Sequence, residues 1–147
     1  MESIEIYTDG GCSGNPGPGG WAFVLRGPAG ETLGSGGEAN TTNNRMELRA
    51  VISGLEEAER QAPGTAVHLI TDSQYVKNGI TSWINNWKRN GWLTSDKKPV
   101  KNRELWEELD KVVARVKPRF SWVKGHAGHE GNERCDQMVQ VEIGKLR

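Results

Sequence analysis

The amino-acid sequence predicts an α/β fold in which helices flank a five-stranded mixed sheet. Two observations support this class: short segments alternate apolar and polar residues as half-buried strands do, and longer segments repeat apolar residues at helical spacing. The predicted order of elements is β-β-β-α-β-α-α-α-β-α. In such a sheet, a ligand is expected where the ends of the strands converge.

The first predicted strand, residues 3–9, alternates between two faces and places Asp9 at its end. The glycine-rich segment at residues 14–20 contains two prolines and predicts a tight turn. It lacks the Lys-Ser/Thr ending of a phosphate-binding P-loop. We therefore interpret it as a turn beside the site and not as a nucleotide cradle.

Residues 21–26 and 32–39 predict two strands of an antiparallel meander, which turns at residues 27–30. The pattern then changes to a helical period from about residue 43 to residue 61. The apolar stripe of this helix consists of Leu48, Val51, Ile52, Leu55, Ala58 and Ala62.

Glu47 lies in or just after the first turn of this helix, which Thr42 or Asn43 can cap. The helix dipole favours a carboxylate at this end. A glutamate that serves only the helix terminus is the alternative to a catalytic glutamate, and the pattern leaves both interpretations open.

The helix is expected to end at Pro63 and Gly64, and a short buried strand at residues 67–71 then delivers Asp72 at its C-terminal edge. Residues 73–88 look helical but broken at Gly79.

Residues 101–116 predict a clearer helix, and residues 120–124 predict the last strand. A glycine-rich loop then precedes a helix that begins near Gly131 and carries Asp136.

The chain has 147 residues, of which 35% are hydrophobic, so we expect a single domain spanning residues 1–147. It contains no apolar run of about 20 residues and no charged-then-apolar leader. We therefore expect no membrane contact, a cytoplasmic location and a monomer. Cys12 and Cys135 are far apart in sequence, which favours reduced thiols over a disulfide.

The formal net charge is zero, but one segment is strongly basic. Between residues 88 and 103, six Lys and Arg side chains face a single acid, Asp96, and Trp83, Trp87 and Trp92 lie in or beside this segment. Aromatic and basic side chains together suit sugar and phosphate contacts. A solvated basic loop with tryptophans packed beneath it is the alternative.

Four carboxylates are predicted near strand and helix ends: Asp9, Glu47, Asp72 and Asp136. Oxygen ligands without a His or Cys cluster suit Mg²⁺ or Mn²⁺ better than Zn²⁺.

Six motifs resemble those of bacterial ribonuclease H, type 1, and they occur in the order of that family. The resemblance runs from about Ile4 to Asp136. The motifs are Tyr7-Thr8-Asp9-Gly10, the glycine-rich turn at residues 14–20, Thr41-Thr42-Asn43-Asn44-Arg45-Met46-Glu47-Leu48, Thr71-Asp72-Ser73-Gln74-Tyr75-Val76, Lys97-Lys98-Pro99-Val100-Lys101-Asn102, and Trp122-Val123-Lys124-Gly125-His126-Ala127-Gly128-His129.

The resemblance implies a ribonuclease H-like fold and an endonuclease that hydrolyses the RNA strand of RNA/DNA hybrids with little sequence preference. It implies a two-metal-ion mechanism that leaves 5′-phosphate and 3′-hydroxyl ends, with two Mg²⁺ ions per site and Mn²⁺ as a possible substitute. The four carboxylates would be the metal ligands, and Asp9 would bridge both ions. His126 would assist proton transfer or product departure, while a histidine that only stabilises its loop is the alternative.

The resemblance also implies the substrate contacts. Cys12, Asn15, Asn43, Asn44 and Gln74 would line the minor groove, although turn-forming and capping roles for Asn15 and Asn43 are compatible alternatives. Thr42 and Asn102 would hold a phosphate of the DNA strand. A basic protrusion at about residues 83–101 would grip that strand through Lys88, Arg89, Lys97, Lys98 and Lys101, with Trp83 against sugars.

Two other functions stay open at this stage: a related carboxylate nuclease or polynucleotidyl transferase that acts on DNA, and a hybrid-binding module without catalysis. The sequence departs from the family immediately after Asp136, where Gln137-Met138-Val139-Gln140 replace an acidic residue followed by Leu-Ala. We therefore expect the terminal helix to pack less regularly than in relatives.

Overall fold

The computed structural model describes residues 3–123 and 130–147. The strands are β1 (Ser3–Cys12), β2 (Gly17–Gly27), β3 (Gly30–Thr41), β4 (Ala66–Thr71) and β5 (Arg119–Trp122). The helices are α1 (Asn43–Gln61), α2 (Gln74–Asn78), α3 (Ile84–Asn90), α4 (Arg103–Val116) and α5 (Glu130–Lys145). A π-helical turn, η1 (Gly79–Trp83), joins α2 to α3, and the predicted order of strands and helices is otherwise confirmed.

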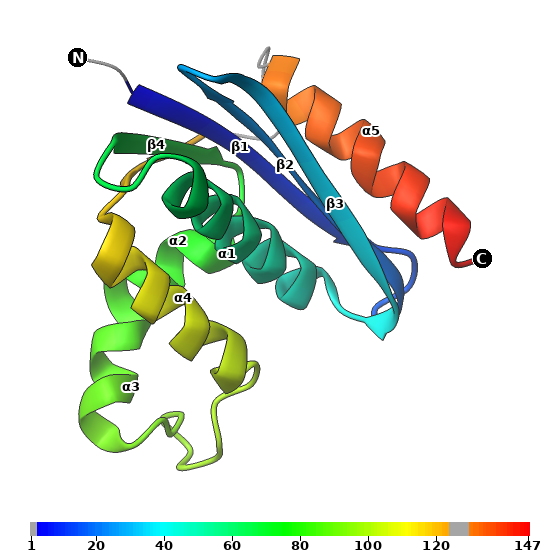
Figure 1. Ribbon diagram of the computed structural model, residues 1–147. Helices are drawn as coiled ribbons and strands as arrows, with labels where there is room; N and C mark the ends of the chain where they lie inside the picture. The colour runs from blue at the N-terminus through cyan, green and yellow to red at the C-terminus, as the bar shows by residue number, and fades with distance from the viewer. Residues whose placement is uncertain (1–2, 124–129) are drawn as a thin grey trace.

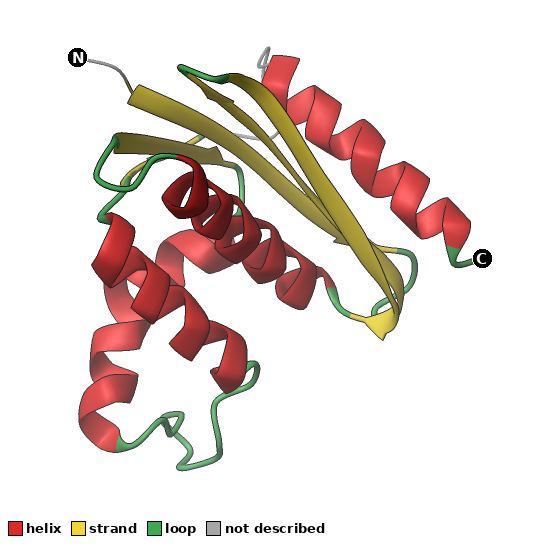
Figure 2. Cartoon of the chain, in the orientation of Figure 1, coloured by secondary structure: helices red, strands yellow, loops and turns green. Residues whose placement is uncertain are grey.

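The five strands form one mixed sheet in the order β3-β2-β1-β4-β5. The pairs β1–β2 and β2–β3 are antiparallel, whereas β1–β4 and β4–β5 are parallel. Figures 1 and 2 show α1 and α4 on one side of the sheet and α5 on the other. The central strand β1 therefore lies between two helical layers.

Each face of the sheet buries its own apolar cluster. On the α1 side, the predicted stripe of α1 packs with Ile6 of β1 and Leu109 of α4. On the α5 side, Ala22 and Val24 of β2 pack against Val139 of α5. These two clusters fix α1 and α5 on opposite faces of the strand that carries Asp9.

Two strands extend through glycines that were predicted to lie in turns. β1 continues past Asp9 to Cys12, and β2 begins at Gly17, so the prediction that Asp9 ends its strand is wrong. Close packing explains the glycines, because a Cβ added at Gly20 would lie 2.9 Å from the backbone oxygen of Val139 in α5.

The predicted break at Gly79 is confirmed as a change of helix type, because α2 ends at Asn78 and η1 begins at Gly79, although the backbone stays helical. Its φ of −63° and ψ of −48° are helical, and the chain continues through η1 into α3. A Cβ at Gly79 would lie 1.9 Å from the indole of Trp106, which is fully buried. The glycine is thus required for packing between this segment and α4. The remaining boundary differences are one or two residues at element ends.

Cys12 and Cys135 are both free thiols, as expected. Among residues 3–123 and 130–147, no helix combines the length and the hydropathy that crossing a bilayer requires.

Candidate active site

The four predicted carboxylates line one cavity of about 500 Å³. They come from four different elements or their ends: β1, α1, the residue after β4, and α5. The other residues that line the cavity are Gly10, Gly11, Asn43, Asn44, Ser73, Gln74, Tyr75, Val139 and Gln140. The structure therefore brings together three of the predicted substrate-binding residues with all four acids.

The parallel pairing of β1 with β4 places Asp9 beside Asp72. The last aligned pair of residues is Tyr7 with Ile70, and Asp9 and Asp72 each lie two residues further along. Side chains two residues apart share a face of the sheet. Because β4 ends at Thr71 while β1 continues, Asp9 lies inside its own strand but at the edge of the parallel part of the sheet.

Glu47 reaches the cavity because α1 approaches β1 closely at Gly10. A Cβ at Gly10 would lie 2.4 Å from the carbonyl carbon of Met46 and 2.5 Å from the backbone nitrogen of Glu47. The Oγ of Ser73 donates a hydrogen bond to Glu47 and accepts one from the backbone nitrogen of Val76 at 3.1 Å. Ser73 thus caps α2 and holds the Glu47 carboxylate at the same time.

Asp136 is placed by α5, which runs uninterrupted across β1 and β2. Its neighbour Cys135 is fully buried and donates from its thiol to the backbone oxygen of Tyr7 at 3.3 Å. Gly131 permits close contact at the start of the helix, since a Cβ there would lie 2.4 Å from the ring of Tyr7. Val139 and Ile143 continue the buried stripe of α5 after Asp136, and the expected difference in packing from relatives stays a prediction.

Burial and mutual repulsion make the cavity electrostatically unfavourable for charged acids. Burial, followed by the negative charges of Asp72 and Asp136, raises the pKa of Asp9 from 3.8 to about 8. Burial also raises the pKa of Glu47, and the hydrogen bond from Ser73 partly opposes this. A bound cation would stabilise the charged forms of these acids. A purely structural role would not account for four acids placed together in one buried cavity.

The four acids line one cavity, but their side chains do not converge on a single point. Within the described parts of the chain, no three Asp, Glu, His or Cys side chains are arranged as a ready-made metal-binding group. His126 lies outside the described residues, so its predicted role stays a prediction.

The start of α1 lies beside the glycine-rich turn. Thr42 caps α1, since its Oγ1 accepts from the backbone nitrogen of Arg45 at 3.3 Å. The Oδ1 of Asn15 accepts from the backbone nitrogen of Asn43 at 3.2 Å, which supports the capping alternative for Asn15, because Asn43 is the first residue of α1. The sulfur of Cys12 lies 3.3 Å from the backbone oxygens of Gly17 and Thr41, which share its single S–H donor. These contacts hold the polar end of α1 against the sheet.

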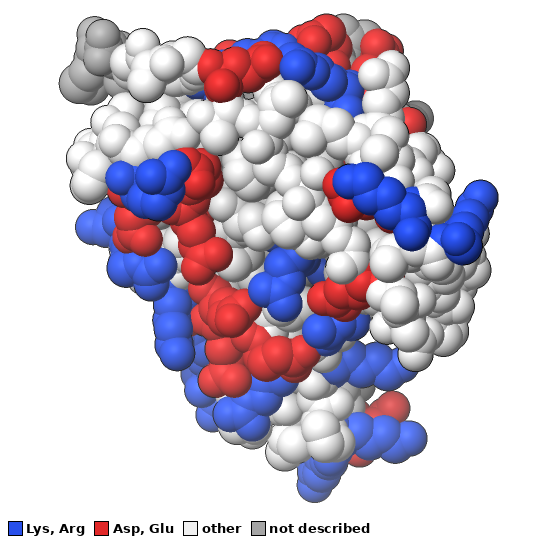
Figure 3. All heavy atoms as spheres, turned by 45° about the vertical axis from the view of Figure 1, so that its right-hand side comes forward, with Lys and Arg blue, Asp and Glu red and all other residues white. Residues whose placement is uncertain are grey.

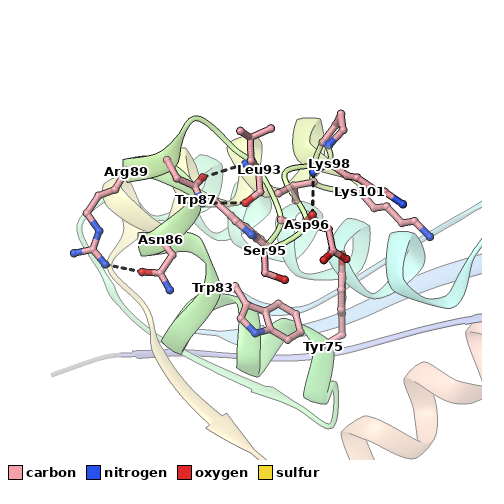
Figure 4. Close-up of a pocket in the computed structure, with 14 residues that line it drawn as sticks. Tyr75, Trp83, Asn86, Trp87, Arg89, Leu93, Ser95, Asp96, Lys98 and Lys101 are labelled. Atoms are coloured by element: carbon pink, nitrogen blue, oxygen red, sulfur yellow. Dashed lines mark hydrogen bonds between the residues drawn. The ribbon is translucent and has the colours of Figure 1, made fainter.

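The basic segment forms a second cavity of about 930 Å³ between α3 and the loop at residues 91–101. Figure 4 shows Trp83 and Tyr75 beneath this loop, with Arg89 pointing to the opposite side from Lys98 and Lys101. Trp83 is 36% exposed, although the centroid of its indole lies 5.8 Å from that of the Tyr75 ring. Both interpretations of the tryptophans hold in part, because Trp83 packs on its neighbours and also reaches solvent.

The loop at residues 91–101 is internally hydrogen-bonded. The backbone nitrogen of Thr94 donates to the oxygen of Lys98 at 2.8 Å, and that of Val100 donates to the oxygen of Trp92 at 3.1 Å. The Oδ1 of Asn90 accepts from the backbone nitrogen of Leu93 at 3.0 Å. The lysines of this segment are therefore displayed from an ordered scaffold.

Not every base of this segment is available to a partner. Lys88 forms an ion pair with Asp110 at 3.2 Å. In contrast, Lys97, Lys98 and Lys101 are exposed and have no ion pair with any described residue. On the face drawn in Figure 3, basic and acidic side chains alternate and do not form one continuous basic surface. The local excess of charge predicted from the sequence is thus partly neutralised by residues outside the segment.

Two residues that line the cavity, Ser73 and Tyr75, and the neighbouring Arg45 of α1 were not identified from the sequence as functional. Ser73 contacts Glu47, which lies 26 positions earlier in the chain. Ser73 follows a strand and precedes a helix, which is typical of a helix cap, but no local pattern indicates its second contact. Such contacts depend on how α1, α2 and α4 are packed.

Comparisons with known proteins decide the family. A family model described as RNase H matches residues 1–143. A curated relative named ribonuclease H, from Rhodopseudomonas palustris strain BisB5, is 58% identical over 147 residues, which cover 100% of this chain and 96% of the relative. The chain belongs to the RNase H family. It is a bacterial ribonuclease H and therefore an enzyme, as the motifs indicated.

Solved structures of RNase H proteins share the fold. The crystal structure of LC9-RNase H1, described as a type 1 RNase H with the type 2 active-site motif, is similar with a TM-score of 0.86 and 30% identity, covering 100% of this chain and 74% of that one. LC11-RNase H1 in complex with an RNA/DNA hybrid is similar with a TM-score of 0.74 and 26% identity, covering 97% and 98% of the two chains. The predicted ribonuclease H-like fold is confirmed.

Proposed function

We propose that this ribonuclease H is an endonuclease that hydrolyses the RNA strand of RNA/DNA hybrids with little sequence preference, using two divalent metal ions. The products would carry 5′-phosphate and 3′-hydroxyl ends. The observation that carries the proposal is the single cavity lined by Asp9, Glu47, Asp72 and Asp136, with amide side chains at its rim.

The chemistry of the cavity fits a magnesium site. Its charged donors are carboxylate oxygens, which Mg²⁺ and Mn²⁺ prefer, and the described lining residues include no His or Cys. The raised pKa of Asp9 reflects negative charges held together in a buried place, which a cation would offset. When bound, two divalent ions would activate water, neutralise the phosphoryl oxygens and support the departing 3′ oxygen.

The chain itself contributes position and charge. Asp9 and Asp72 are fixed by paired strands, while Ser73 restrains Glu47 through a hydrogen bond. We propose that all four carboxylates would hold the metal ions. His126 is proposed to assist proton transfer or departure of the product.

We propose that the substrate lies along the polar end of α1. Asn43, Asn44 and Gln74 are exposed where they line the cavity, and amides of this kind can contact the 2′-hydroxyl groups that distinguish RNA from DNA. Cys12 and Asn15 would border the same groove. Readout of sugars and shape in place of base edges accounts for weak sequence preference.

The DNA strand is proposed to be held at two places. Thr42 and Asn102 would hold one phosphate, and the basic protrusion would hold others. In that protrusion the exposed Lys97, Lys98 and Lys101 are the strongest candidates, with Lys88 and Arg89 contributing charge and Trp83 packing against sugars. The hybrid bound to the similar LC11-RNase H1 supports this class of substrate. A monomeric state and a cytoplasmic location stay predictions.

The test of the proposed function is cleavage of matched end-labelled duplexes. RNA/DNA hybrid, duplex RNA and duplex DNA are each incubated with Mg²⁺, with Mn²⁺ and with chelator. Cutting confined to the RNA of the hybrid, and dependent on metal, is expected. Equal cleavage of duplex DNA, or activity that survives chelation, would contradict the proposal.

The role of the protrusion is tested by the double variant Lys97→Ala with Lys98→Ala. Loss of two phosphate contacts should weaken hybrid binding and reduce the slope of log affinity against log salt by about 2. Lys111→Ala with Arg119→Ala removes the same charge from exposed positions outside the protrusion and serves as the matched control. An equal change of slope in both double variants would show that only net charge matters.

A further inference from the structure

Asn102 precedes α4 in an unusual conformation. Its φ of 61° lies in the left-handed region, which asparagine tolerates better than most residues. Asparagine is a preferred N-cap residue, but the side chain of Asn102 makes no capping hydrogen bond to α4. Its backbone oxygen instead accepts from the nitrogens of Leu105 and Trp106, both at 3.0 Å. The side-chain amide is thus directed to other partners.

Both ends of the Asn102 amide are held by residues of other helices. The Nη1 of Arg45 in α1 donates to its Oδ1 at 3.3 Å. Its Nδ2 donates to the hydroxyl oxygen of Tyr75 in α2 at 3.2 Å. The same hydroxyl accepts from the indole nitrogen of Trp106 at 2.9 Å. A relay therefore links the beginnings of α1 and α4 to the helix that follows Asp72.

The chemistry of these partners permits one orientation of the amide. A guanidinium has donors and no acceptor, so only the oxygen of Asn102 can face Arg45. The NH₂ group must then face Tyr75, and it retains a second hydrogen for another acceptor. Without Arg45, the amide could rotate by half a turn and the Tyr75 hydroxyl could donate to its oxygen instead.

Arg45 is itself fixed at both ends. Its backbone nitrogen donates to the Oγ1 of Thr42 at 3.3 Å. Its guanidinium donates to Glu104 of α4 at 2.6 Å and lies 3.7 Å from Glu38 of β3. Arg45 therefore contacts both residues that are proposed to hold the DNA phosphate. One side chain sets the relative position of the two.

We propose that Arg45 and Tyr75 are positioning residues that orient the amide of Asn102, so that its second N–H points to a phosphate of the DNA strand. The inference rests on the proposed function, since it deepens the phosphate contact of Thr42 and Asn102. An amide rotated the other way would present an oxygen to the phosphate, which repels it. The effect of both residues on substrate binding is therefore exerted through Asn102.

The test is a double-mutant cycle between Tyr75→Phe and Asn102→Ala. Tyr75→Phe removes only the hydroxyl and keeps the ring that packs at 5.2 Å from Trp106. Asn102→Ala should raise KM for the hybrid about tenfold, as for loss of one hydrogen bond to a charged group. Tyr75→Phe alone should raise KM about threefold with kcat nearly unchanged, and should have no further effect in the Asn102→Ala background.

Substitutions of Arg45 provide a second, independent test of the positioning role. Arg45→Met should raise KM as much as Tyr75→Phe or more, and Arg45→Lys should restore part of the loss because lysine also donates without accepting. Ser121→Ala is the control, because it removes the partner of His68 at 2.6 Å on the edge strand β5, outside the proposed site. It should leave KM unchanged even if it lowers stability.

The outcomes separate this inference from the proposed function. Additive effects of Tyr75→Phe and Asn102→Ala on KM would overturn the positioning role while hybrid cleavage stands. An unchanged KM in Asn102→Ala would overturn it as well, because Asn102 would then not contact the substrate. Absence of hybrid cleavage by the wild-type protein would instead overturn the proposed function, and the inference with it.

Discussion

Replacing Asp9 with asparagine is expected to stabilise the metal-free protein and to abolish cleavage. Asp9 is held in a buried cavity with Asp72, Asp136 and Glu47, and these surroundings raise its pKa from 3.8 to about 8. Asparagine has nearly the same shape but carries no charge. The variant therefore removes a repulsion that, in the wild-type protein, the proposed metal ions would offset.

The magnitude follows from proton linkage. Because the folded state keeps a proton at Asp9 that the unfolded chain has lost, the free energy of unfolding of the wild type falls as pH rises above 3.8, and it levels off above about pH 8. Each pH unit in this interval costs up to about 1.4 kcal/mol, so the full cost at pH 7 is about 4 kcal/mol. Counter-ions that screen the cavity reduce it toward about 2 kcal/mol.

The assay is urea unfolding in chelator, followed by circular dichroism, across pH 4 to 8. Asp9→Asn should be about 2–4 kcal/mol more stable than wild type at pH 7 and nearly equal to it near pH 4. Added Mg²⁺ should stabilise the wild type more than the variant, because binding to the folded state raises its stability. Asp96→Asn, which changes an exposed acid outside the cavity, should show no such pH-dependent gain.

The result that would refute the reasoning is equal or lower stability of Asp9→Asn at pH 7 in chelator. A gain that does not change with pH would also refute it, since the cost would then not arise from ionisation. Retention of cleavage by the variant would remove Asp9 from the proposed ligands without affecting the stability argument.

Two further substitutions test how the site is supported. Ser73→Ala removes the donor to Glu47 and the cap of α2, so the Mg²⁺ concentration for half-maximal activity should rise about 10–100-fold, measured by metal titration, and Ser73→Thr should recover much of the loss. An unchanged metal requirement would mean that Ser73 only caps α2 and does not position Glu47. The second substitution, Gly79→Ala, should lower the free energy of unfolding in urea by about 1–3 kcal/mol, because the added methyl would lie 1.9 Å from the indole of Trp106. A neutral effect would show that α4 moves away at little cost.

Local patterns were sufficient for most of the fold. The helical stripe from Leu48 to Ala58 predicted α1 within its observed bounds, because a helix with one buried face must repeat apolar residues at that spacing. Glycine misled the prediction at Gly20, which lies in β2, whereas at Gly79 α2 changes to η1 and the backbone stays helical. In isolation a glycine indicates a turn or a break, whereas here both positions permit close packing against segments more than 25 residues away.

The sequence by itself indicated the family, the four acids as candidate metal ligands, and the segment in which the basic residues are concentrated. Each depends on residue identity and short spacing, which the chain displays directly. Only the tertiary structure decided that Asp9 lies within a strand, that Ser73 holds Glu47, and that Arg45 joins Thr42 to Asn102. The contacts of Ser73 and Arg45 reach residues of other elements. Their geometry depends on how closely α1, α2 and α4 approach the sheet and one another. Neither periodicity nor composition specifies such distances.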